Sequence, residues 1–199
     1  MAYSDFTVGK VKQAFGLETI EGQRFLPELS PMDPSQALAD FLAEAFPLAS
    51  LLKSEKAKSE LLIAPVLLEV RKLLQRQVSL FSGEEFTVDA QVGLSGICDF
   101  VISQSTEQLE IEAPVIVVVE AKKADLNVGM GQCMAEMVAA QRFNQAMERP
   151  SKQVYGCVSS GILWRFLQLE GQVVTIDMED RLLNPLSQLL GILVWMAQP

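Results

Sequence analysis

The chain has 199 residues, of which 49% are apolar and 21% charged, so it is long enough to form one globular domain with a sizeable core. Its formal net charge is −9, and it contains no histidine. The missing imidazoles exclude Ser/His/Asp and Cys/His nucleophile systems, HExxH proteases and histidine-ligated zinc. Any catalysis must therefore use carboxylates, amines, hydroxyls or thiols.

The cysteines and the apolar segments indicate the compartment. Cys98, Cys133 and Cys157 form no CxxC pair and are odd in number, which favours a reducing environment. The N-terminus lacks the apolar core of a signal peptide, and the strongest apolar run, 114–119, is far too short to cross a bilayer. We expect a soluble, cytoplasmic protein with no membrane partner, in which the thiols are small core residues.

Charge is distributed unevenly along the chain. Residues 77–121 contain eight acids and no base, whereas 51–76 and 122–165 each contain six bases and three acids. An acidic run of this kind is either a solvated face or part of a site for a divalent cation. A polyanionic partner would need such a cation, or basic segments around the acidic one.

The N-terminal part of the chain predicts helices. Asp33-Pro34 has the form of a helix N-cap followed by proline, and the helix should continue until Pro47 interrupts it. A second, strongly apolar helix is expected from Ser54 to about residue 77, with a kink at Pro65. Residues 1–53 are thus predicted to be a helical extension.

Strand patterns follow. Alternating apolar residues predict a half-buried strand over 86–92, and Gly93 and Gly96 predict a turn into a second strand, 97–103. The run 114–123 is β-branched without alternation, which is typical of a central strand buried on both faces.

The C-terminal part predicts a helix after Gly129 and Gly131, three further strands and a closing helix. The strands are expected at 153–160, 162–170 and 173–178, and the closing helix at 186–196. We predict a single α/β domain over 1–199, with a mixed sheet flanked by helices and a C-terminal hairpin and helix in 161–199.

Two carboxylates and an amine are predicted to meet at one edge of this sheet. Asp99 lies on the strand before the central one, and Glu120 and Lys122 lie at the end of the central strand, on the same side of it. Carboxylate oxygens suit Mg²⁺ or Mn²⁺, and an ammonium group can stabilise charge that develops on a phosphate. The pattern favours a metal site that could act on a phosphate over the alternative, a structural ion pair between Glu120 and Lys122.

The segments GICDF (96–100), EAK (120–122) and GQCMAEM (131–137) resemble the PD-(D/E)XK nuclease superfamily, in particular the nuclease domains of type I restriction subunits. The resemblance spans about 54–160 and implies a restriction-endonuclease-like αβββαβ core that hydrolyses nucleic acid, DNA more than RNA. It implies Asp99, Glu120 and the Ala121 carbonyl as ligands of Mg²⁺ or Mn²⁺, and Lys122 as the catalytic lysine. Cysteine precedes Asp99 where the family motif has proline.

The resemblance also implies an assisting glutamate and glutamine. Glu55, Glu60 and Glu69 are the candidates on the first helix of the nuclease-like core, and Glu60 is preferred. Gln132 is expected at the start of the helix after the central strand, either beside the site or as an ordinary amide cap.

An alternative hypothesis is a catalytically inactive member of the same fold that serves as a binding or assembly subunit. The acidic balance and the missing DNA-reading domain motivate it. The partners expected are a nucleic acid, with a protein partner supplying DNA contacts, or a second copy bound through the apolar segment 192–196.

Overall fold

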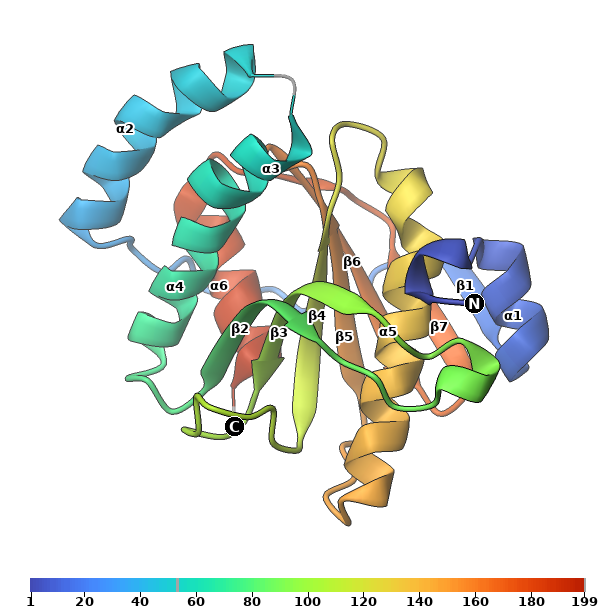
Figure 1. Ribbon diagram of the computed structural model, residues 1–199. Helices are drawn as coiled ribbons and strands as arrows, with labels where there is room; N and C mark the ends of the chain where they lie inside the picture. The colour runs from blue at the N-terminus through green and yellow to red at the C-terminus, as the bar shows by residue number, and fades with distance from the viewer. Residues whose placement is uncertain (53, 199) are drawn as a thin grey trace.

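The computed structural model describes residues 1–52 and 54–198 and contains an eight-stranded mixed sheet with helices on both faces (Figure 1). The strand order is β1-β7-β6-β5-β4-β3-β2, and β8 pairs with β6. The strands are β1 (Glu18–Gln23), β2 (Ser79–Glu85), β3 (Ile97–Ser103), β4 (Val115–Ala121), β5 (Val154–Ser159), β6 (Leu163–Glu170), β7 (Val173–Asp177) and β8 (Arg181–Leu182). The predicted mixed α/β class is confirmed.

The helices divide into two layers (Figure 1). They are α1 (Val8–Phe15), α2 (Gln36–Leu51), α3 (Glu55–Lys58), α4 (Ala64–Leu73), α5 (Leu126–Ala146) and α6 (Leu186–Ala197), with the short turns η1 (Tyr3–Asp5), η2 (Ser59–Ile63) and η3 (Ala90–Val92). Helix α5 covers one face of the sheet with α1 outside it, α4 and α6 cover the other, and α2 packs on α4 and η2. None of the described helices is both long and apolar enough to span a membrane.

The central strands lie where the sequence predicted them. Strand β3 has the predicted bounds, and all seven residues of β4 are buried, as the unbroken β-branched run requires. Strand β4 is antiparallel to β3 and parallel to β5. The parallel pair is joined by α5, the crossover helix that a parallel connection needs.

The prediction of a strand over 86–92 is wrong. The strand that pairs with β3 is β2, which ends at Glu85, and residues 86–96 form a loop containing η3 and a bridge between Asp89 and Leu94. Gly83, a residue type typical of turns, lies inside β2 with φ +68°. The alternation of Phe86 and Val88 instead reflects two side chains that pack on the α5 core from a loop.

Two helix boundaries also differ from the prediction. Ser35, not Asp33, caps α2 by accepting from the Leu38 N–H, and the helix continues through Pro47 because its buried face packs against α4 and η2. The predicted helix start at Ser54 is confirmed: Ser54 is the N-cap of α3, and its Oγ accepts from Ala57 N at 3.1 Å. Beyond it the helical backbone passes from α3 through the π-helical η2 into α4, and Pro65 is the second residue of α4.

The two ends of the chain complete the sheet and the core. The segment 1–53 is not purely helical, because it supplies β1, which pairs in parallel with β7. The apolar segment 192–196, predicted as a dimer surface, is largely buried in α6 against α4 and β4. That surface is therefore not available to a partner.

Helix α5 begins at Leu126, capped by Asp125, so Gly129 and Gly131 lie inside it and not before it. A Cβ at Gly131 would overlap the Phe6 carbonyl and the Thr7 backbone, whereas a Cβ at Gly9 in α1 would meet nothing. We expect Gly131→Ala to lower the free energy of unfolding by about 1–3 kcal/mol. The matched Gly9→Ala change should raise it by up to about 1 kcal/mol. Urea denaturation measures both, and equal effects would contradict the close packing of α5 on the N-terminus.

Candidate active site

Asp99 and Glu120 come together at the end of two neighbouring strands. Phe100 pairs with Val119 in the antiparallel β3–β4 ladder, so the next residues along each strand are Asp99 and Glu120. Asp99 Oδ2 accepts from the backbone N–H of Ala121 at 2.8 Å. The side chain of Asp99 thus takes the place of a ladder hydrogen bond and holds its carboxylate beside the end of β4.

Lys122 and Gln132 bind the two oxygens of Glu120. The Lys122 ammonium forms an ion pair with Glu120 Oε1, and Gln132 Nε2 donates to Glu120 Oε2 at 2.8 Å. Glu120 is 1% exposed, and the side chain of Lys122 is 16% exposed. Gln132 lies in the second turn of α5, and its amide caps no helix end, so the amide-cap interpretation is wrong.

The electrostatics of Glu120 are those of a buried carboxylate near a second one. Burial, and then the Asp99 charge, raise the pKa of Glu120 to about 8, although Lys122 opposes the shift. For Lys122, burial alone would lower the pKa, but the Glu120 carboxylate outweighs it and raises the pKa, with help from Glu55 and Asp99. The site is therefore short of positive charge even with Lys122 in it.

Glu136 is a further member of the site that was not predicted from the sequence. Its side chain is fully buried, Gln132 Nε2 donates to its Oε1 at 3.1 Å, and its Oε2 has no hydrogen-bond partner in the described chain. Burial, and then Glu120, raise its pKa well above the usual range. Its signal in the sequence was an acid one helical turn after Gln132 within an apolar helix.

A hollow of about 290 Å³ opens beside Asp99. Its lining includes Glu55, Ser59, Glu60, Asp99 and Ala121. Glu60 is on η2, with its side chain 63% exposed and 3.5 Å from Lys56. Glu120 and Lys122 do not line the hollow, so Asp99 and Ala121 connect it to the buried pair.

Glu69, the third candidate glutamate, lies elsewhere. Its carboxylate accepts from Ser35 N at 2.7 Å and Ser35 Oγ at 2.9 Å, and Lys72 approaches it to 3.6 Å. These contacts explain why Glu69 is buried: it fastens the start of α2 to α4. Glu69 takes no part in the Asp99 site.

The oxygen donors at this edge fit a hard divalent cation. No three His, Cys, Asp or Glu side chains cluster closely enough for a metal within residues 1–52 and 54–198. Asp99, Glu120 and the Ala121 carbonyl would thus supply only a few protein ligands, and water molecules would fill the other coordination positions. Mg²⁺ prefers this kind of coordination. Burial and the Asp99 charge disfavour the ionised form of Glu120, and Oε2 of Glu136 has no hydrogen-bond partner in the described chain.

The two basic segments of the sequence contact each other beside the hollow, and one of them contributes Lys56 to its lining. Lys56 and Lys58 lie on α3. The Nζ of Lys58 donates to the backbone carbonyl of Lys123, in the loop between β4 and α5, at 2.8 Å. The two basic segments of the sequence therefore meet at the mouth of the acidic site.

Comparison with known proteins leaves the family open. No protein-family model matches the chain, and no curated protein matches it. The function is therefore argued from the arrangement of the site itself.

Proposed function

We propose that the chain is a Mg²⁺- or Mn²⁺-dependent nuclease with a PD-(D/E)XK-type site on a restriction-endonuclease-like core. The observation that carries the proposal is the meeting of Asp99, Glu120 and Lys122 at the adjoining ends of β3 and β4. The chain order α4, β2, β3, β4, α5, β5 matches the αβββαβ core that the resemblance implies. A structural ion pair alone would not require Asp99, Gln132 and Glu136 around it.

The roles follow from chemistry and placement. Asp99, Glu120 and the Ala121 carbonyl would hold the cation, which when bound supplies Lewis-acid polarisation of a phosphoryl oxygen and a more acidic water. The Lys122 ammonium would stabilise the negative charge that develops on the phosphate or orient the attacking water. Gln132 fixes the Glu120 carboxylate, and Glu60 stands at the opening of the hollow.

The lysines beside the hollow support a nucleic-acid substrate. Lys56, Lys58 and Lys123 offer phosphate contacts around an otherwise acidic site, so binding should weaken as salt rises. DNA is proposed ahead of RNA, as the resemblance to restriction subunits implies.

The test is cleavage of single- and double-stranded DNA and RNA by the purified protein with Mn²⁺, together with calorimetric titration of Mn²⁺. We expect cleavage, and we expect Asp99→Ala to abolish both cleavage and Mn²⁺ binding. A parent that cleaves none of the four substrates contradicts the nuclease. Mn²⁺ binding that survives in Asp99→Ala contradicts the metal site and favours a non-catalytic binding subunit.

A further inference from the structure

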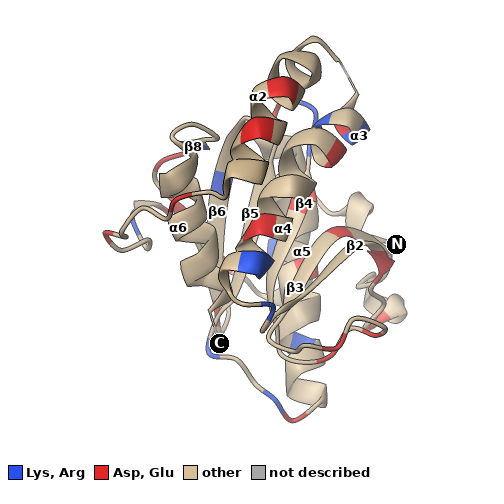
Figure 2. Cartoon of the chain, turned by 90° about the vertical axis from the view of Figure 1, so that its left-hand side faces the viewer, with Lys and Arg blue, Asp and Glu red and all other residues tan. Residues whose placement is uncertain are grey.

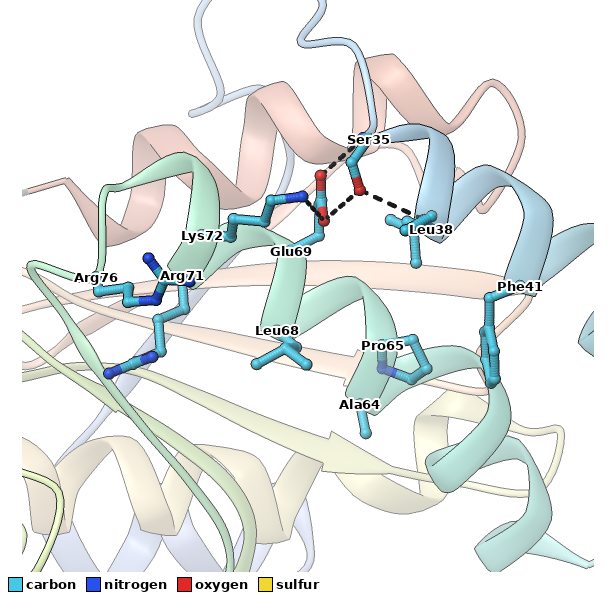
Figure 3. A pocket seen from close by; sticks show the side chains of 11 residues that line it. Ser35, Leu38, Phe41, Ala64, Pro65, Leu68, Glu69, Arg71, Lys72 and Arg76 are labelled. Carbon is cyan, nitrogen blue, oxygen red and sulfur yellow. Dashed lines mark hydrogen bonds and ion pairs between the residues drawn. The ribbon is translucent and has the colours of Figure 1, made fainter.

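A groove lies between α2 and α4, on the side of the molecule away from α5 (Figures 1 and 3). Its volume is about 550 Å³. Phe41, Pro65 and Leu68 line its apolar part, and Phe41 and Leu68 are 44% and 60% exposed. Two large apolar side chains thus face solvent across one concave surface.

The other end of the groove is basic. Arg71, Lys72 and Arg76 lie at the C-terminal turn of α4 and just beyond it (Figures 2 and 3). Lys72 approaches Glu69, and Arg71 Nε donates to the Val78 carbonyl at 3.1 Å. In the described part of the chain, neither Arg71 nor Arg76 forms an ion pair with an acid. The groove therefore offers apolar contact at one end and unneutralised guanidinium charge at the other.

The loop between β3 and β4 has the opposite character. Leu109 is 91% exposed and is flanked by Glu107, Glu110 and Glu112, with no base between β3 and β4. The loop is held by its own hydrogen bonds: Glu107 Oε1 accepts from the N–H groups of Gln108 and Leu109, and Ser105 Oγ donates to Glu112. An ordered loop thus presents a leucine amid carboxylates, which is the complement of the groove.

The two surfaces lie at the same end of the sheet. Ser79 pairs with Ser103, so the turn that contains Arg76 and the start of the acidic loop are neighbours. No residue of the loop lines the groove of its own chain. Complementary patches that lie close together on one surface can engage reciprocally about a two-fold axis, with each copy giving its loop and receiving the other.

We propose that the groove between α2 and α4 receives the acidic loop 104–113 of a second copy of this chain. Leu109 of one copy packs on Leu68 and Phe41 of the other, and Glu110 pairs with Arg76. The proposal uses neither Asp99 nor Lys122 and does not depend on nuclease activity.

The test is the oligomeric state, measured by sedimentation velocity and light scattering over about 1–200 µM protein, the range in which an interface of ordinary size associates. We expect a dimer that Leu109→Ser weakens about tenfold or more. The matched change Leu182→Ser removes an exposed leucine on β8, outside both surfaces, and should leave the dimer intact.

A charge exchange tests the pairing itself. Arg76→Glu alone should weaken the dimer, and combining it with Glu110→Arg should restore affinity to within about tenfold of the parent, because the pair is remade with its signs reversed. A parent that stays monomeric over the whole range overturns the proposal. A dimer that is insensitive to Leu109→Ser and Arg76→Glu overturns it as well.

Discussion

Lys122→Met is expected to lower the rate of nucleic-acid cleavage by a factor of about 10²–10⁴, the range typical of removing a group that stabilises transition-state charge or takes part in proton transfer. The same change should leave Mn²⁺ binding intact or tighten it. Lys122 occupies one oxygen of Glu120, so its removal frees that oxygen for the cation, which binds as the carboxyl releases its proton. A general loss of structure would abolish both cleavage and Mn²⁺ binding, so loss of cleavage alone would identify a catalytic role for Lys122.

Single-turnover cleavage and Mn²⁺ calorimetry on the same preparation measure the two effects. Lys152→Met is the matched control, because Lys152 is an exposed lysine that pairs with Glu170 near the start of β5, away from the site. Since breaking a buried ion pair is destabilising, thermal denaturation should accompany the assay to show that the variant is folded. Full activity in folded Lys122→Met would show that Lys122 has no catalytic role.

Glu136→Gln is expected to raise the free energy of unfolding by about 1–3 kcal/mol at pH 8, because it removes a buried carboxyl whose ionised form finds no cation. Glutamine keeps the volume and can still accept from Gln132. The pKa of Glu136 is raised in the folded chain, so the folded state holds its proton more tightly than the unfolded state does. The stability of the parent should therefore fall as the pH rises above the ordinary glutamate value of 4.5.

The gain from Glu136→Gln should accordingly be small at pH 4 and grow toward pH 8, which chemical denaturation at the two pH values measures. Glu120, whose pKa of about 8 lies above the same ordinary value, adds a pH dependence of the same sign to both chains. Glu69→Gln is the control, since Glu69 is also buried but both its oxygens are used by Ser35. Glu69→Gln should lower the free energy of unfolding. If both variants raised it, the hydrogen bonds to Glu69 and the missing partner of Glu136 could not explain their different burial energies.

Local pattern accounts for the parts of the fold that were predicted correctly. The β-branched run of β4 and the returning strand β3 are specified by their own residues, and so is the helix start at Ser54. The prediction of a strand over 86–92 was wrong because Gly83, a residue type typical of turns, lies within β2 with a positive φ. Helix α2 passes through Pro47 because packing on α4 and η2 outweighs the lost backbone hydrogen bond.

The residues of the candidate site also include some that local pattern predicted and one that it did not. Asp99, Glu120 and Lys122 were predicted because strand periodicity places Glu120 and Lys122 on one side and puts Asp99 on a neighbouring strand. Glu136 was missed because its spacing from Gln132 places the two on one face of a helix but does not show that this face is buried beside the Glu120 carboxylate.

The sequence by itself determined which side chains are open to chemistry in this protein, because a chain without histidine is left with carboxylates, amines, hydroxyls and thiols. It also determined the central strands, whose side chains have no favourable place outside a core. Only the tertiary structure decided which of Glu55, Glu60 and Glu69 reach the hollow beside Asp99, and that the two basic segments meet at its mouth. The reason is that burial and charge depend on neighbours distant in the chain, and only folding sets those neighbours.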